Sequence, residues 1–274
     1  MTNHVDAHVH LWAFARGDYP WAATLAPESR RDRSVTEMAP ILAGSGITAA
    51  VLIQAAPTRD ETTFLLEQAR QSNGLVRGVV GALDLRATDA VPVLAHLARD
   101  PLFKAVRLRL ADGASAPGAD VDRALKVFPR LGLRLEVSAS AVHAQSVLEL
   151  LQRHPDLPVV VDHAAGATAR TEDFAAWRAH VGTLGTLARV RCKVTGLVSA
   201  AGPGWTIDGI RPWFDALVDA FGPQRLMWGS DWPCLERTAT YRSWWAATVA
   251  MTRDWTADER AAFLGGAARR FYGI

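Results

Sequence analysis

Residues 134–163 read RLEVSASAVHAQSVLELLQRHPDLPVVVDH, and this stretch predicts a strand, a helix and a second strand. The apolar runs 134–137 and 159–163 have the length and composition of buried strands. Between them, residues 142–154 repeat apolar side chains at helical spacing and stop before Pro155. A helix that joins two buried strands is typical of parallel strands with a crossover connection.

The same alternation continues along the whole chain of 274 residues. Strand-like runs cover residues 5–11, 48–54, 77–83, 104–110, 134–137, 159–163, 190–194 and 226–230. Helical spacing is found in residues 62–72, 90–98, 122–131, 142–154, 174–187, 211–221, 241–251 and 258–271. Eight such units fit a closed barrel better than an open sheet. We therefore expect an α/β fold, a (β/α)8 TIM barrel, as a single domain over residues 1–274.

Composition limits the partners that the chain is expected to bind. The formal net charge is +2 and no basic block stands out, which argues against nucleic acid and anionic membranes as partners. There is no signal-peptide pattern, no apolar run reaches the roughly 18 residues needed to span a bilayer, and the two cysteines lack CxxC spacing. We expect a cytoplasmic protein that acts on a small molecule; the sequence leaves open whether it forms a homo-oligomer.

Polar residues at the carboxyl ends of the strands are the candidate site, because active sites of (β/α)8 barrels lie there. His8 and His10 are two positions apart and point to one face of the first strand. His163 ends the sixth predicted strand, and Asp231 follows the eighth. Each signal alone also has a structural explanation: a solvent-facing histidine pair, a core histidine, or an aspartate in a turn.

A second set of polar residues occupies segments around the same predicted site. Arg107 and Arg109 share one face of the fourth strand, where they either point into the barrel mouth and bind carboxylate or hydroxyl groups, or lie outside it. Lys193 in the seventh strand must be paired or face the site. Gln54 ends the second strand, and Trp21 lies in the long loop 12–34, a candidate lid.

In combination, these motifs resemble those of the amidohydrolase superfamily. The resemblance rests on the HxH pair at residues 8–10, VVVDH at 159–163, KVTGL at 193–197 and DAFGPQRLMWGSDWP at 219–233. More narrowly, the chain is similar to the branch of sugar lactonases and dicarboxylate-lactone hydrolases, the L-fuconolactonase-like proteins, nearly from end to end. The single motifs are modest signals, but their combination is specific.

The resemblance implies a carboxylic-ester hydrolase, a lactonase, that opens a small aldonolactone by attack of water on the lactone carbonyl. Asp231 would be the general base, and His8, His10 and His163 would surround the carbonyl oxygen. The candidate substrate contacts are Arg107, Arg109, Gln54, Lys193 and Trp21. The sequence does not choose among sugar lactones or between ring sizes.

A metal requirement is left open by the sequence. His8, His10, His163 and Asp231 have the ligand types of a mononuclear zinc site. Metal-dependent members of the superfamily usually supply a further ligand from the middle strands, where this chain has Glu136 but no histidine. We interpret Glu136 as a structural partner of an arginine; a base at the rim and a metal ligand are its alternative roles.

Two rival functions also stay open at this point. One is a metal-dependent decarboxylase of an aromatic or enoic acid, from a related amidohydrolase branch, which would need a firmly held metal and a pocket for a flat acid. The other is a barrel that binds lactones without hydrolysing them. The filled base and electrophile positions argue against this second rival.

Overall fold

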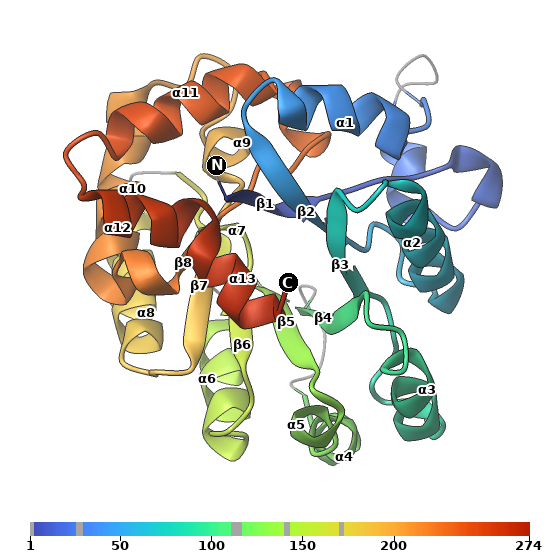
Figure 1. Ribbon diagram of the computed structural model, residues 1–274. Helices are drawn as coiled ribbons and strands as arrows, with labels where there is room; N and C mark the ends of the chain where they lie inside the picture. The colour runs from blue at the N-terminus through green and yellow to red at the C-terminus, as the bar shows by residue number, and fades with distance from the viewer. Residues whose placement is uncertain (1–2, 26–29, 111–116, 140–142, 170–172) are drawn as a thin grey trace.

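Eight parallel strands follow one another around a barrel in the computed structural model (Figure 1), in the sheet order β1-β2-β3-β4-β5-β6-β7-β8. The structure describes residues 3–25, 30–110, 117–139, 143–169 and 173–274. The strands are β1 His4–Val9, β2 Ile47–Ile53, β3 Val76–Gly81, β4 Phe103–Leu110, β5 Arg134–Ala139, β6 Val159–Val161, β7 Val190–Val194 and β8 Leu226–Trp228. This order confirms the predicted (β/α)8 fold.

Helices connect the strands and surround the barrel (Figure 1). The α-helices are α1 Val35–Ala43, α2 Arg59–Gln71, α3 Ala90–Leu97, α4 Ala119–Leu125, α5 Phe128–Leu131, α6 Ala144–Arg153, α7 His163–Gly166, α8 Phe174–Gly185, α9 Leu197–Ala201, α10 Ile207–Phe221, α11 Tyr241–Met251, α12 Ala257–Ala261 and α13 Ala267–Tyr272. The other short helices are η1 Phe14–Arg16, η2 Pro20–Thr24, η6 Pro223–Arg225, η7 Cys234–Arg237 and η8 Ala262–Gly266. Within the described residues, no helix combines the length and the apolar character needed to cross a membrane.

The barrel closes between β1 and the segment that follows β8. Val9 and Trp232 form a parallel bridge, the backbone N–H of His10 donates to the carbonyl of Trp232 at 2.8 Å, and the N–H of Asp231 donates to the carbonyl of His8 at 2.9 Å. These bonds lie at the carboxyl ends of the strands. The seam of the barrel therefore fixes the first-strand histidines against Asp231.

A buried carboxylate reinforces this seam from below. Asp6 Oδ1 accepts hydrogen bonds from the backbone N–H groups of His8 and Ser230, and Oδ2 accepts one from the Tyr241 hydroxyl. Burial raises the pKa of Asp6 to about 6 in spite of these three donors. Asp6 thus ties β1, the end of β8 and α11 together, which supports both strands that carry site residues.

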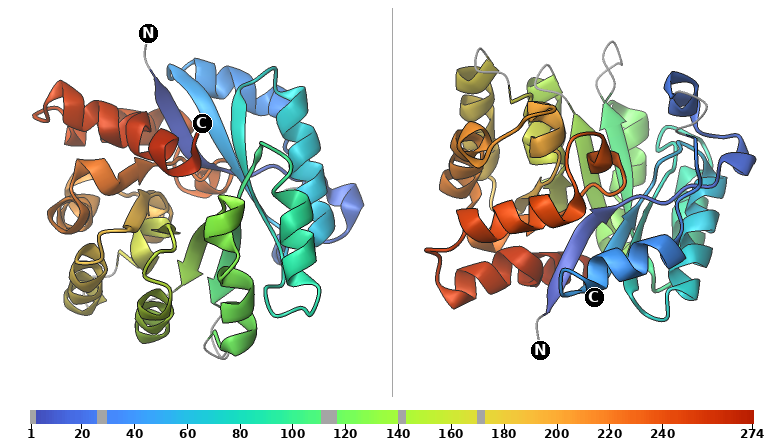
Figure 2. Two further views of the ribbon diagram at one scale, coloured as in Figure 1. Left: turned by 60° about the horizontal axis from the view of Figure 1, so that its bottom comes forward. Right: turned by 90° about the horizontal axis from the view of Figure 1, so that it is seen from above.

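The amino end of the barrel is plugged by the C-terminal helix. Apolar side chains inside the barrel pack on α13, whose Phe271 and Tyr272 are buried with them. Both chain termini lie at this end, seen at the bottom of the right-hand view in Figure 2. The opposite, carboxyl end is therefore the one that a substrate can enter.

Two helix predictions were wrong because a local residue interrupts the regular pattern. Residues 122–131 were expected to form one helix, but α4 ends at Leu125 and α5 begins at Phe128. Leu125 lies four residues before Pro129, and the ring of a proline clashes with the carbonyl at that position. Residues 258–271 are likewise divided by η8, where a Cβ on Gly265 would lie 2.2 Å from the carbonyl oxygen of Asn3.

Among the described residues, three α-helices were not predicted: α1 and the short helices α7 and α9. The segment that forms α1 contains Pro40, which weakens its helical pattern. Val35, Met38 and Leu42 nevertheless pack into the main core. Tertiary packing rather than intrinsic preference stabilises this helix. The start of the helix predicted for residues 142–154 falls partly outside the described residues.

Candidate active site

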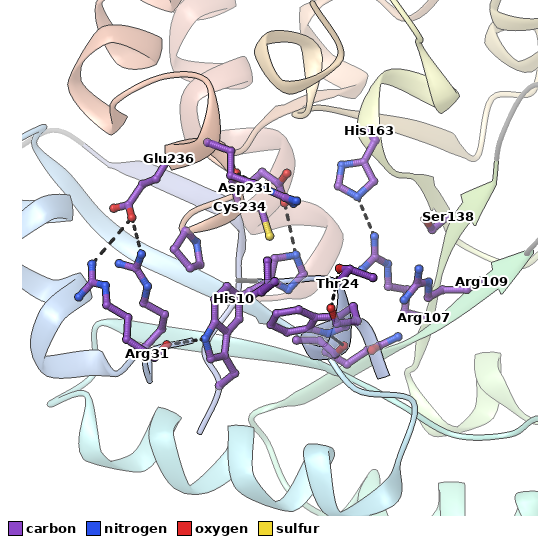
Figure 3. A pocket seen from close by; sticks show the side chains of 18 residues that line it. His10, Thr24, Arg31, Arg107, Arg109, Ser138, His163, Asp231, Cys234 and Glu236 are labelled. Atoms are coloured by element: carbon purple, nitrogen blue, oxygen red, sulfur yellow. Dashed lines mark hydrogen bonds and ion pairs between the residues drawn. The ribbon is translucent and has the colours of Figure 1, made fainter. Parts of the chain in front are cut away.

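A cavity of about 690 Å³ opens at the carboxyl end of the barrel (Figure 3). Residues from several strand ends and from the long loop after β1 line it. Among the residues predicted from the sequence, the lining includes His10, Trp21, Gln54, Arg107, Arg109, His163 and Asp231. His8 and Lys193 are not part of this lining and lie buried near it.

The histidines of β1 meet Asp231 in one cluster. His8 Nε2 and His10 Nε2 are 3.2 Å apart, and Asp231 Oδ1 lies 3.3 Å from His10 Nε2 and 3.7 Å from His8 Nε2. The ring of His163 lies against that of His8, with 4.8 Å between the ring centroids. Residues from the first, sixth and eighth βα units therefore share one site, although together they span more than 200 positions of the chain.

Unusual backbone conformations present two of these side chains. His163 has φ 48° and Asp231 has φ 62°, both in the left-handed region that non-glycine residues rarely occupy. Such conformations cost on the order of 1–3 kcal/mol each and concentrate at functional sites. His163 follows the short strand β6 by two positions, and Asp231 follows the short strand β8 by three. The strands hold the backbone in place, and the turns direct the side chains toward the cavity.

A hydrogen bond fixes the orientation of the His10 ring. His10 Nδ1 lies 2.8 Å from the carbonyl oxygen of Ile53. A carbonyl only accepts, so Nδ1 carries a proton and Nε2 is the atom presented to His8 and Asp231. A backbone carbonyl behind a histidine is the usual support of a metal-binding imidazole.

Arg107 connects two consecutive residues of the VVVDH motif. Its Nε lies 2.8 Å from Asp162 Oδ2, and its Nη2 lies 2.8 Å from His163 Nε2. A guanidinium only donates, so His163 Nε2 accepts and this ring is neutral. Burial lowers the pKa of His163; the negative charge of Asp231 opposes this shift, and the positive charge of Arg107 adds to it.

Asp162 is a site residue that the sequence reasoning did not single out. Besides Arg107, it lies near His8, with 3.6 Å between Asp162 Oδ1 and His8 Nδ1. Although burial would raise its pKa, the charges of Lys193 and Arg107 hold the pKa of Asp162 well below its usual range. One sequence signal could have identified Asp162: its carboxylate directly follows the valine run 159–161, and a charge at the end of a buried strand needs a partner.

Lys193 lies beneath the cavity rather than in its wall. Its Nζ is 2.7 Å from Glu136 Oε2, 3.4 Å from Asp162 Oδ1 and 3.4 Å from His8 Nδ1. The other oxygen of Glu136 accepts a hydrogen bond from Tyr272. Lys193 is therefore paired, and its position gives no support to the predicted substrate contact. It lies behind His8 and Asp162.

The loop after β1 forms one wall of the cavity. Trp12 and Arg33 pair through their backbones at the base of this loop, and Trp21 Nε1 donates to the carbonyl of Ala55 at 2.8 Å. Further lining residues that the sequence reasoning did not single out are Arg31, Arg33, Ser138, Cys234 and Glu236. They lie in loops or at strand ends with no regular spacing, so no sequence pattern marked them. Residues 26–29 of the candidate lid lie outside the described residues.

The cluster has the chemistry and spacing of a divalent-metal site. Metal bonds of about 2.0–2.2 Å place tetrahedral donors roughly 3.3–3.6 Å apart. The separations of 3.2, 3.3 and 3.7 Å among His8 Nε2, His10 Nε2 and Asp231 Oδ1 match this spacing. His8, His163 and Asp231 also form a possible metal-binding group by distance. One proton cannot pair His8 Nε2, His10 Nε2 and Asp231 Oδ1 at the same time, whereas one bound cation would contact all three acceptor atoms.

Comparison with known proteins places the chain in a family. A family model described as amidohydrolase matches residues 5–274, so the chain belongs to this amidohydrolase family. An L-fucono-1,5-lactonase of Burkholderia ambifaria is 34% identical over 100% of this chain and 97% of its own. An L-fucono-1,5-lactonase of Burkholderia multivorans is 31% identical over 98% of this chain and 96% of its own.

Solved structures agree with this assignment. A crystal structure of an amidohydrolase from Burkholderia multivorans with bound Zn is 31% identical, covers 100% of both chains and has a TM-score of 0.92. A 5-carboxyvanillate decarboxylase from Novosphingobium aromaticivorans has a TM-score of 0.72 over 100% of this chain and 96% of its own, but is only 12% identical. The decarboxylase similarity extends to the fold alone.

Proposed function

We propose that the protein is a lactonase that opens a small sugar lactone to the corresponding hydroxy acid. The observation that carries this proposal is the meeting of Asp231, His10 and His163 with Arg107 in a single open cavity. A base and electrophilic groups are the two things that lactone hydrolysis needs. The two Burkholderia L-fucono-1,5-lactonases at 34% and 31% identity support the lactone as substrate.

In this proposal Asp231 takes the proton of the attacking water. Burial alone would raise the pKa of Asp231, but its contacts with His10, His163 and His8 outweigh burial and lower the pKa. The carboxylate is therefore ionised at neutral pH. Once protonated by the water, Asp231 can return the proton to the alkoxide that leaves when the ring C–O bond breaks.

Arg107 and His163 are the proposed partners of the carbonyl oxygen. Arg107 is ion-paired with Asp162 and donates one hydrogen bond to His163, and its remaining donors are available to the cavity that Arg107 lines. Donors that are fixed before the reaction stabilise the oxyanion at no cost of reorganisation. Asp162 holds the guanidinium in place and so acts as a positioning residue.

We propose zinc as the cation of this site, held by His8, His10 and Asp231. His163 is left out of this ligand set because its Nε2 accepts from Arg107 and its Nδ1 then carries the ring proton. Bound there, a divalent metal would polarise the carbonyl and lower the pKa of water. The zinc-containing relative from Burkholderia multivorans supports this choice. The hydrogen bond from His10 Nδ1 to Ile53 orients one ligand whether or not the cation is bound.

The test is a panel of sugar lactones assayed by proton release, with and without chelator. Asp231→Asn is expected to lower kcat by about 10²–10⁴, while Asp254→Asn, at an exposed position, leaves it unchanged. Equal rates for native protein and Asp231→Asn across the panel would refute the lactonase proposal. Loss of activity with chelator and recovery with Zn²⁺ supports the zinc site; undiminished activity in metal-free protein refutes it.

A further inference from the structure

The cavity lining is strongly cationic. Five of its residues are arginines, and two are carboxylates, Asp231 and Glu236. Arg31 and Arg33 are paired with Glu37 at 2.8 and 2.7 Å, and Arg33 also with Glu236. These pairs neutralise the side of the cavity formed by the long loop. The arginines of β4 lie on another side.

Arg109 differs from its neighbour Arg107. Asp162 neutralises Arg107, whereas Arg109 forms no ion pair or side-chain hydrogen bond with any residue in the described ranges. Burial and the positive charge of Arg107 lower the pKa of Arg109, and the charge of Asp162, which is paired with Arg107, offsets this only in part. An uncompensated guanidinium in a cavity wall is a binding site for an anion.

Register places Arg109 closer to the cavity mouth than Arg107. The two residues are two positions apart on one face of β4, which is about 7 Å along a strand, and Arg109 is the more exposed. Ser138 is the register partner of Arg109 on β5 and also lines the cavity. Figure 3 shows both arginines directed into the cavity, with Ser138 beside them. Arg109 and Ser138 therefore lie on the mouth side of Arg107, where the far end of a bound ligand can reach them.

A second unpaired group faces the same space. Gln54 is buried and lines the cavity, yet its Oε1 has no hydrogen-bond partner among the described residues. Buried amide groups without partners are costly and rare in folded proteins. A hydroxyl of a bound sugar would supply the missing donor. The cavity thus has one position for a hydroxyl and another for an anion.

We propose that Arg109 and Ser138 form a subsite for a carboxylate that does not react, so that the preferred substrate is an aldaric lactone, a sugar lactone with a free carboxylate at its far end. This inference rests on the proposed lactonase activity and narrows it. A neutral aldonolactone leaves Arg109 without a counterion, while an aldaric lactone supplies one. Ser138 donates a second hydrogen bond to the same carboxylate.

The first experiment uses three lactones of galacto configuration that differ only at the sixth carbon. Fuconolactone carries a methyl group there, galactonolactone a hydroxymethyl group and galactarolactone a carboxylate. The native protein is expected to turn over galactarolactone with a kcat/KM at least about 10-fold above the other two, the size expected of one charge-assisted hydrogen bond. Equal kcat/KM values, or preference for a neutral lactone, would overturn the proposal.

Variants identify the residue that is responsible. Arg109→Met is expected to lower kcat/KM by about 10- to 100-fold for galactarolactone and less than about threefold for fuconolactone. Arg130→Met is the control, because Arg130 is exposed in α5, is not part of the cavity lining and forms no ion pair among the described residues. If both variants lose the same factor, or if Arg109→Met affects all three lactones equally, the subsite does not exist.

Binding of the ring-opened acids separates this inference from the proposed function. Calorimetry is expected to show tighter binding of galactarate than of fuconate, and Arg109→Met is expected to remove the difference. If no lactone is hydrolysed but this Arg109-dependent difference is present, the lactonase proposal fails and the subsite stands. If lactones are hydrolysed but galactarate binds no better than fuconate, the subsite fails and the lactonase proposal stands.

Discussion

The ammonium group of Lys193 lies 2.7 Å from Glu136 Oε2, and both side chains are fully buried below the histidine cluster. Lys193 also approaches His8 Nδ1 at 3.4 Å. The Lys193–Glu136 pair therefore lies directly beneath His8 and supports its ring. Burial raises the pKa of Glu136 to about 7, and the charge of Lys193 opposes this shift. The ionised form of Glu136 therefore depends on the ammonium group of Lys193.

Removing one member of this pair is expected to destabilise the fold. Lys193→Met leaves a buried carboxylate without its cation, which typically costs about 3–5 kcal/mol. The double variant Lys193→Met with Glu136→Leu removes the uncompensated charge and is expected to recover part of this loss. Urea unfolding measures both, with the exposed Lys126→Met as control. A double variant at least as unstable as Lys193→Met alone would contradict this account.

Arg107 is expected to be irreplaceable by lysine. One guanidinium reaches both Asp162 and His163 at 2.8 Å, which a single ammonium on a flexible chain does not reproduce. Arg107→Lys is therefore expected to lower kcat by about 10²–10³, the cost of a lost oxyanion donor, with a near-native melting temperature. Steady-state kinetics with Arg59→Lys, a surface arginine paired with Asp89, provide the comparison. Native kcat in Arg107→Lys would exclude the bridging role.

Gly229 is expected to control the site without touching the substrate. A Cβ at this position would lie 2.8 Å from the Cβ of His8, so a methyl group there forces His8 to move. Gly229→Ala is expected to reduce kcat at least about tenfold, because small displacements of reacting groups are costly. Gly182→Ala, in α8 with open space around the new Cβ, is the control and should keep full activity. Unchanged kcat in Gly229→Ala would show that the cluster tolerates displacement.

The pH dependence of kcat/KM follows from the direction of three pKa shifts. Burial and the Lys193 charge hold the pKa of His8 well below 6.5, burial lowers that of His163, and the pKa of Asp231 is lowered as well. The active form needs neutral histidines and an ionised Asp231, and all three conditions hold above pH 6.5. We expect kcat/KM to be constant from pH 6.5 to 8 and to fall only at lower pH. An acid limb centred above pH 7 would contradict these directions.

The barrel was predictable because parallel strands are marked by local pattern. The predicted strand 190–194 coincides with β7, and the predicted strand 104–110 differs from β4 by one residue. Apolar runs of this length need no knowledge of their neighbours. Helix boundaries were less predictable, since Pro129 and Gly265 act through contacts with a preceding turn and with Asn3 respectively.

The candidate site was predictable where a polar residue ends an apolar strand. His10, His163 and Asp231 carry this signal, and all three line the cavity. Lys193 carries it too, yet alternation alone did not indicate that its charge is satisfied by Glu136 from another strand. Asp162 was missed because its partner Arg107 lies 55 positions earlier in the sequence.

The sequence by itself determined the order of strands and helices, and with it the end of the barrel that carries the site, because hydrophobic periodicity is a local property. The tertiary structure decided which charges are paired. Arg107 and Lys193 have buried partners, while Arg109 has none within the described residues. Pairing depends on distances between strands that only barrel closure sets, and a strand charge that is left unpaired at the cavity is available to a ligand.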